Sequence, residues 1–270
     1  MPNGLPDPDH ARDPAGPPER SDPADPAPIV LRSLHWTAPL RWLLLGWRDF
    51  VRAPSIGLFF GGCFVIMGWA LLWVYQHAPA YTLALSGGFL LVGPFLCLGL
   101  YRVSQRLEQG LRPEFGDALR AWDTRSGQLA IFGLVLLVLE LLWGRATLVV
   151  FAVSFDRLPQ FKPSLWSLLE PDMLPFLATW AAVGAVFAGL IYSLSVISIP
   201  MILHRRTDAI TAALTSARLV LSQTGVMLFW GALITLLVVL ALLPGLLGLL
   251  VVGPVLGHAS WHAYRAAVAD

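Results

Sequence analysis

Long apolar runs alternate with short basic segments along most of the chain. No Asp, Glu, Lys or Arg occurs in residues 53–101, 173–204 or 219–264. Each of these runs exceeds the roughly 20 apolar residues that an α-helix needs to cross a bilayer. The pattern therefore predicts an all-α, polytopic transmembrane helix bundle.

Turn residues divide the apolar runs into six predicted spans. The last run, from Val226 to Tyr264, is nearly twice the hydrocarbon thickness if it forms one helix, so Pro244-Gly245 is expected to turn the chain near its middle. The predicted spans cover about 56–74, 80–101, 128–155, 174–203, 226–243 and 246–263.

Residues 33–52 predict a short amphipathic helix before the first span. Thr37 is expected to cap it, and Pro54 to end it. A helix with this pattern suits a membrane surface; the alternative is a soluble helix packed on other cytoplasmic loops. Leu40, Leu43, Leu44, Trp47 and Val51 fall on one face, and Arg41, Arg48 and Arg52 on another.

Three segments of the chain resemble one another. Each contains an arginine that stands thirteen residues before a glycine near the start of an odd-numbered span, and each even-numbered span carries a proline toward its cytoplasmic end. The predicted unit is a surface helix, a span out and a span back, and the alternative is chance similarity among leucine-rich helices. The third surface helix is expected at 208–222 with Thr207 as its cap. The arginines are Arg48, Arg120 and Arg218, the glycines Gly61, Gly133 and Gly231, and the prolines Pro94, Pro200 and Pro254.

The basic residues predict the orientation. With the N-terminus inside, fifteen Lys and Arg lie on the cytoplasmic side and only Arg157 and Lys162 lie outside. Positive residues are enriched in cytoplasmic loops. The expected location is therefore the bacterial inner membrane, with both termini in the cytoplasm.

Composition agrees with this topology. The chain is 56% hydrophobic and 13% charged, and a soluble domain carries roughly twice that charge. The net charge of +1 gives no indication of nucleic-acid binding. Residues 1–28 hold nine prolines and six acidic residues, which predicts a disordered tail before a membrane domain at 29–270. Cys63 and Cys97 lie in apolar runs and are expected to be packing residues.

Several longer motifs resemble a bacterial family of multi-pass membrane proteins without an established activity. They are APLRWLLLGWRDFVRAPSIGLFFGG, SGGFLLVGPFLCLGLYRVSQRLEQG, DAITAALTSARLVLSQTG and GPVLGHASWHAYR. The resemblance covers roughly residues 30–268 and implies the topology but little chemistry. Some members of that family carry the label of cytochrome c oxidase subunits.

The histidines allow a test of that label. A haem–copper oxidase core needs several histidines on separate spans, whereas only His204, His258 and His262 fall near inner span ends. His258 and His262 share a helix face and could form a small metal or haem site with His204. The alternative is that they lie at the headgroup boundary beside Trp261 and Tyr264. We favour this second interpretation, so no cofactor is expected.

Glu140 and Arg145 are the charged residues inside a predicted span. A charge there costs at least ~2.5 kcal/mol, so Glu140 should face protein or water and have a partner. Arg145 lies about 140° further around the helix, so each is expected to pair with another span, unless Arg145 extends toward the headgroups. The functional hypothesis is a proton or ion pathway, and the alternative is a structural hydrogen bond.

No catalytic motif is present, because the chain lacks a Walker loop, an HExxH motif and a GxSxG motif. Asp49, Asp117 and Asp208 are interpreted as helix caps or solvated acids. The sequence favours a non-enzymatic inner-membrane protein, and the alternatives are a small-solute or lipid transporter and an accessory factor of a respiratory oxidase. The expected partners are the lipid bilayer and a second copy of the chain or a membrane complex.

Overall fold

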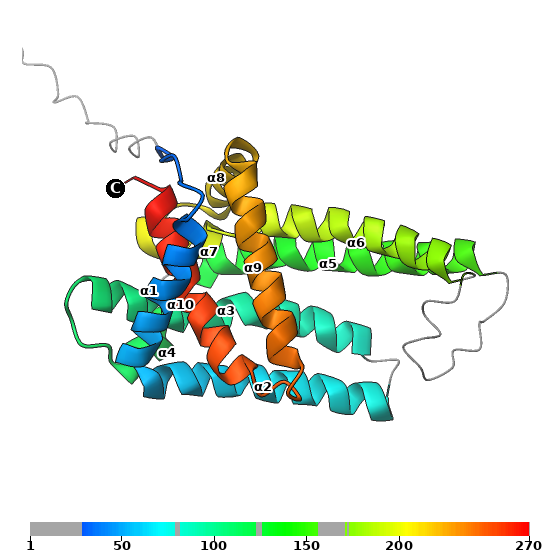
Figure 1. The fold of residues 1–270 in the computed structure, drawn as a ribbon, viewed down its shortest axis with the longest axis horizontal. Helices are drawn as coiled ribbons and strands as arrows, with labels where there is room; N and C mark the ends of the chain where they lie inside the picture. Colours follow the sequence, from blue (N-terminus) through cyan, green and yellow to red (C-terminus); the bar gives the residue numbers. More distant parts are fainter. Residues whose placement is uncertain (1–28, 79–81, 123–125, 156–170, 172, 270) are drawn as a thin grey trace, which may run out of the picture.

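The structure is a computed structural model that describes residues 29–78, 82–122, 126–155, 171 and 173–269. The predicted tail at 1–28 lies outside the described residues, as do Arg157 and Lys162. The described chain is helical along most of its length (Figure 1). In chain order the helices are α1 (Ala38–Arg52), α2 (Pro54–His77), α3 (Thr82–Glu108), α4 (Phe115–Leu119), the 3₁₀ helix η2 (Arg120–Trp122), α5 (Ser126–Ser154), α6 (Leu174–Ser195), α7 (Ser198–Arg205), α8 (Ala209–Ser222), α9 (Thr224–Leu242) and α10 (Leu249–Ala267).

Helix α1 begins at Ala38, directly after the predicted cap Thr37, and covers the later part of the amphipathic segment at 33–52. Thr37 occupies the N-cap position but makes no side-chain cap hydrogen bond. Pro54 is the first residue of α2, where the fixed φ and missing N–H of proline are tolerated. Pro54 therefore separates the two helices, as the sequence predicts.

The residues before α1 pair with the C-terminal end of the chain. Leu31 and Val268 form an isolated antiparallel bridge. The N–H of Arg32 donates to the carbonyl of Ala267 at 2.8 Å, and the side chain of Gln223 donates to the carbonyl of Arg32 at 2.7 Å. Both ends of the described chain consequently lie on the same side of the molecule.

The predicted span at 174–203 is interrupted. Its helix ends at Ser195, and α7 begins at Ser198. Proline removes the bond to the carbonyl four residues earlier and clashes with it, so Pro200 accounts for the break near Val196. The hydroxyl of Ser216 on α8 compensates at the break, because it donates to the carbonyl of Ser193 at 2.7 Å and accepts from the N–H of Ile197 at 3.4 Å.

The cap of α8 also differs from the prediction. Asp208, and not Thr207, is the N-cap residue, and its carboxylate accepts a hydrogen bond from the N–H of Thr211 at 2.8 Å. A charged acceptor at this position satisfies a free N–H and interacts favourably with the helix dipole. The interpretation of Asp208 as a cap is thus confirmed.

The last apolar run folds as two helices joined by a turn, as predicted from Pro244-Gly245. Gly245 has a φ of +63° in this turn, which glycine adopts without strain. The turn contacts α2, where the indole N–H of Trp69 donates to the carbonyl of Gly245 at 3.0 Å. Trp69 lies eight residues before α2 ends at His77, about 12 Å along its axis. In Figure 1, α9 runs across the direction of α5 and α6.

Helix α10 lies at the centre of the packing and contacts α1, α2 and α3. Two glycines permit the close approach of its neighbours. A Cβ on Gly46 of α1 would lie 2.6 Å from the carbonyl oxygen of Val255, and one on Gly61 of α2 would clash with the carbonyl oxygen of Leu250. Any side chain at either position would push α10 away.

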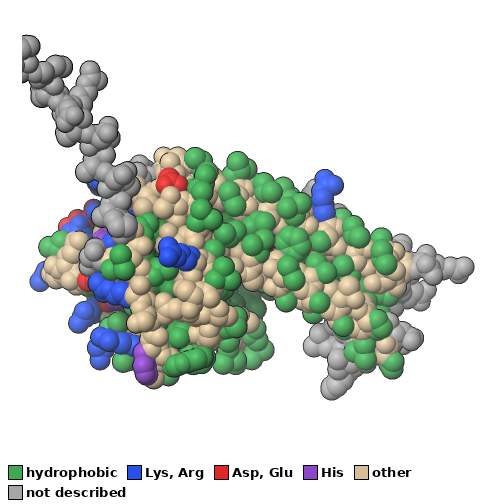
Figure 2. Space-filling view, turned by 90° about the horizontal axis from the view of Figure 1, so that it is seen from above, with side chains coloured by type: hydrophobic (Ala, Val, Ile, Leu, Met, Phe, Trp, Pro, Cys, Tyr) green, Lys and Arg blue, Asp and Glu red, His purple; other side chains and the backbone are tan. Residues whose placement is uncertain are grey.

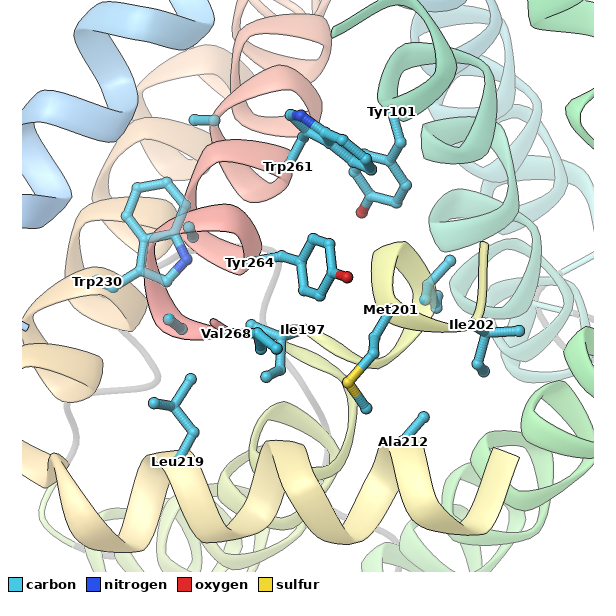
Figure 3. Packing of buried hydrophobic residues seen from close by; sticks show 14 of the residues in the cluster. Tyr101, Ile197, Met201, Ile202, Ala212, Leu219, Trp230, Trp261, Tyr264 and Val268 are labelled. Atoms are coloured by element: carbon cyan, nitrogen blue, oxygen red, sulfur yellow. The ribbon is translucent and has the colours of Figure 1, made fainter. Parts of the chain in front are cut away.

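The main core surrounds the C-terminal half of α10 (Figure 3). Trp230, Trp261 and Tyr264 are at most 1% exposed. Trp230 also meets Trp42 edge to face, with ring centroids 5.5 Å apart, an arrangement that aromatic pairs prefer. Large buried aromatic side chains of the described residues therefore concentrate at the end of the molecule around α10, which we call the well-packed end.

Four stretches within the described ranges are long and apolar enough to cross a membrane: Pro54–His77, Ser126–Ser154, Leu174–Arg205 and Thr224–Leu242. The predicted spans at α3 and α10 are not among them. Lys and Arg side chains on the visible face gather at the end where α1 and the C-terminus lie (Figure 2). Apolar side chains are abundant along the rest of that face.

Candidate functional site

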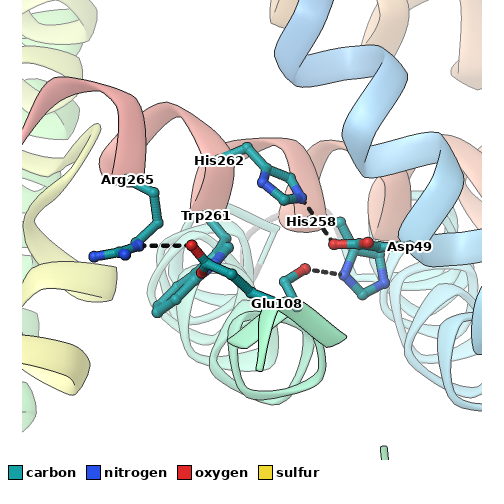
Figure 4. Close-up of polar contacts among 7 residues, drawn as sticks. Asp49, Glu108, His258, Trp261, His262 and Arg265 are labelled. Carbon is teal, nitrogen blue, oxygen red and sulfur yellow. Dashed lines mark hydrogen bonds and ion pairs between the residues drawn. The ribbon is translucent and has the colours of Figure 1, made fainter. Parts of the chain in front are cut away.

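Polar side chains of α10 meet α1 and α3 at the well-packed end of the molecule (Figure 4). His258, His262 and Arg265 recur at helical spacing, so they project from one side of α10. Their partners are Asp49 of α1 and two residues of α3, Ser104 and Glu108. We name these residues, together with Trp261, the α10 network.

The hydrogen bond between Asp49 and His262 lies in the interior of the network. Nε2 of His262 donates to Oδ2 of Asp49 at 2.8 Å, and the two side chains are 15% and 7% exposed. Sequence reasoning placed Asp49 among the caps and solvated acids, and the structure corrects that interpretation. Asp49 lies on the face of α1 that packs on α10, beside Gly46 and Phe50.

Ser104 and His258 form a second buried contact. A hydrogen bond links Oγ of Ser104 and Nδ1 of His258 at 2.8 Å, and both residues are 0% exposed. Nε2 of His258 is buried and has no hydrogen-bond partner among the described residues. A substrate could not reach a serine hydroxyl at this depth, so the pair is suited to packing and not to nucleophilic attack.

Glu108 forms the outer edge of the network. Its carboxylate accepts from Nε1 of Trp261 and from Nε of Arg265, each at 3.1 Å. The side chain of Glu108 is 40% exposed, so water screens its ion pair with Arg265. The network therefore extends along α10 from a buried interior to a solvent-exposed edge.

The three histidines that the sequence suggests as metal or haem ligands have separate partners. Nδ1 of His204 is hydrogen-bonded to the hydroxyl of Tyr264 at 2.8 Å, whereas His258 and His262 contact Ser104 and Asp49. Among the residues that the structure describes, no group of three His, Cys, Asp or Glu side chains could hold a metal ion.

Glu140 and Arg145 occupy α5, away from the α10 network. Oε1 of Glu140 is buried without a hydrogen-bond partner in the described part of the chain, and Arg145 is exposed. The expected pairing of Glu140 with another span is therefore not seen within these ranges. Oγ1 of Thr147 is a second buried atom without a described partner, and it lies two turns further along the same face of α5.

The five predicted surface arginines are all exposed and belong to short helices at one end of the molecule. These helices also direct apolar side chains outward: Leu44 and Trp47 on α1 are 51% and 48% exposed, and Leu214 on α8 is 63% exposed. The arginines are Arg41, Arg48 and Arg52 on α1, Arg120 on η2 and Arg218 on α8.

Sequence reasoning missed Asp49, Ser104 and Glu108 as members of a network. A partial indication was available, since Asp49 interrupts the apolar and basic pattern of α1 on the face that carries Trp42 and Gly46. Its partner lies 213 residues away. No local pattern identifies a contact at that separation.

Comparison with protein families supports the membrane assignment. Residues 81–204 match the model of a family described as a predicted integral membrane protein (DUF2189). No curated protein and no solved structure matches the chain. The described helices include four that are long and apolar enough to cross a membrane. The chain is thus a multi-pass integral membrane protein, similar over residues 81–204 to a family whose function is unknown.

Proposed function

We propose that the protein is a non-enzymatic scaffold of the bacterial inner membrane, with six spans, two cytoplasmic termini and a basic end that lies on the inner leaflet. The observation that carries the proposal is the set of short helices at this end. On α1, the outward residues Leu40, Leu44, Trp47 and Val51 are each about half exposed. Three exposed arginines accompany them.

This arrangement suits the boundary between lipid and water. An apolar stripe can enter the headgroup region while arginines contact anionic lipids. On α8, the exposed residues Ile210, Leu214 and Leu221 form a similar stripe beside Arg218. Ser104 and His258 of the network are fully buried, so this serine is not placed for attack on a substrate.

The pairing of the termini supports an even number of spans. Because Leu31 and Val268 form a bridge, the membrane domain begins and ends on the same side. The order of a short helix followed by two long ones recurs as α1–α2–α3, α4–α5–α6 and α8–α9–α10. Three outward and return crossings, with α3 and α10 as return spans, give the proposed six.

The third hairpin is the best place to test this topology, because its turn meets α2 before that helix ends. In a variant without Cys63 and Cys97, Leu247→Cys, which is 53% exposed at the turn, should react with an impermeant maleimide from outside intact cells. Leu214→Cys on α8 is the matched control and should react only after lysis. Protection of position 247 in intact cells would reduce the number of complete crossings to four.

Depth-dependent quenching tests the surface helices. A fluorophore at Leu44→Cys of the full protein in anionic liposomes should be quenched by lipids labelled near the headgroup. Thr37→Cys, which precedes α1, should be quenched less. Equal quenching at the two positions would contradict the proposed placement of α1.

A small-solute or lipid transporter is the second candidate, and one observation favours it. Glu140 and Thr147 each leave a buried oxygen without a described partner on one face of α5, where a solute or water could bind. Uptake into proteoliposomes that Glu140→Gln abolishes without loss of folded protein would favour this function over the scaffold. Co-purification with oxidase subunits would instead favour a role as an accessory factor.

A further inference from the structure

A groove of about 610 Å³ lies between the extended segment 29–33 and the end of α8. Arg32 and Ser33 line it from the extended segment, and Arg218, Ser222 and Gln223 line it from α8 and the residue that follows. The groove is at the basic end of the molecule and is separate from the α10 network.

The fold holds the groove in a defined shape. Arg32 is fixed through its backbone, because its N–H binds the carbonyl of Ala267 and its carbonyl accepts from Gln223. Gln223 also accepts the N–H of Leu34 through Oε1 at 2.5 Å. Arg218 is carried by the regular helix α8. Hydrogen bonds thus hold the segment 29–33 beside the end of α8, although the two are far apart in the sequence.

The charge of the groove indicates an anionic ligand. Arg32 and Arg218 are both exposed, and neither makes an ion pair within the described part of the chain. The hydroxyl of Ser33 adds a further polar group. Guanidinium groups bind phosphate oxygens in pairs of parallel hydrogen bonds, so a phosphate group fits the chemistry of this groove.

The surroundings of the groove indicate a lipid as the source of that phosphate. Arg218 flanks the outward stripe of α8, in which Ile210, Leu214 and Leu221 are 67%, 63% and 78% exposed. A phosphate in the groove would place acyl chains beside this stripe. We propose that the groove binds the headgroup of an anionic phospholipid of the inner leaflet, an inference that rests on the proposed position of the basic end at that leaflet.

Lipid retention by the full protein tests the site. Native mass spectrometry of detergent-purified protein should show retained phosphatidylglycerol but little phosphatidylcholine. Arg32→Gln and Arg218→Gln should each lower retention about fivefold, since a basic residue near an anionic surface contributes about that factor. The double variant should lose more than either single variant, and Arg218→Lys should retain part of the binding.

Arg48→Gln is the matched control, because Arg48 is an exposed arginine of the same end that does not line the groove. An equal loss in Arg48→Gln would overturn the site in favour of general surface charge. If millimolar inorganic phosphate displaced the retained phosphatidylglycerol, the groove would bind free phosphate, and the assignment to a lipid headgroup would be wrong. Maleimide labelling at position 247 is measured on the same variants. It shows whether the proposed topology fails, independently of whether lipid binding in the groove is lost.

Discussion

The end of the molecule around α10 and the α5–α6 hairpin bury their side chains in different ways. Nine residues of α10 are buried, among them His258 and Trp261, whereas α6 has no buried residue. The first region forms a core of its own from buried side chains of several helices. The hairpin leaves its sides for lipid to cover. We infer that intramolecular packing at the basic end, and not the hairpin, determines the stability of this protein outside a bilayer.

The largest effect on the free energy of unfolding is expected when two tryptophans, one from each region, are compared. Trp230 is 0% exposed in the core, whereas Trp180 on α6 is 38% exposed. Trp230→Ala should lower the free energy of unfolding by about 4 kcal/mol, because a large cavity remains. Trp180→Ala should cost less than about 1 kcal/mol in detergent. The measurement is equilibrium unfolding in mixed micelles, followed by circular dichroism. Equal losses would show that the hairpin contributes as much to the fold as the core.

The second test compares the two ends of the α10 network. Removing Asp49 leaves the buried ring nitrogen of His262 without its hydrogen-bond partner, so Asp49→Ala should cost about 2 kcal/mol. A double-mutant cycle with His262→Ala should give a coupling energy of about 1–3 kcal/mol. The cycle between Glu108 and Arg265, at the solvent-exposed edge, should give less than about 1 kcal/mol. A larger coupling at that edge would contradict the order inferred from burial.

The long apolar helices were easier to predict from the sequence than the network, for a physical reason. In lipid every backbone polar group must be bonded within the segment, so a long apolar run has to be helical. The predicted spans at α2, α5 and α9 accordingly agree with the structure to within three residues at each end. The positions of the apolar runs along the sequence contain this information.

The network depends on contacts between distant segments, which the sequence does not reveal. The pattern of α1 predicts an outward stripe that the structure confirms for four of its five residues, whereas Leu43 packs against the core. The inward face of Trp42, Gly46 and Asp49 is determined by α10. The break between α6 and α7 could have been predicted from Pro200, because proline disrupts a helix interior. Its compensation by Ser216 of α8 could not.

Glu140 provides a third test of this difference, because it lies on α5 of the hairpin. Its buried Oε1 has no described partner, and an unsatisfied buried polar group costs about 1–3 kcal/mol. Glu140→Leu should therefore raise the free energy of unfolding by about 1 kcal/mol, and Glu140→Gln should leave it nearly unchanged. The measurement is the same micellar unfolding. A clear loss in Glu140→Leu would show that the carboxyl group has a partner that stabilises the fold.

The smallest expected effect concerns the cap of α8, which attaches the surface helix to the packed end. Hydrogen bonds from the side chain and backbone of Thr211 lower the pKa of Asp208 from its ordinary value of 3.8. Because the folded-state pKa is depressed, the cap contributes its full stability above pH 3.8 and loses it as the pH falls through the folded value. Asp208→Ala should cost about 1 kcal/mol at pH 7 and less at pH 3, because the carboxyl group of the unfolded chain binds protons below its ordinary pKa of 3.8. Asp208→Asn is the matched control, since it retains a capping oxygen but does not titrate, and its stability relative to the native protein should improve as the pH falls from 5 to 3. If the difference between native and Asp208→Ala protein is independent of pH over that range, the carboxylate is not the group that caps α8.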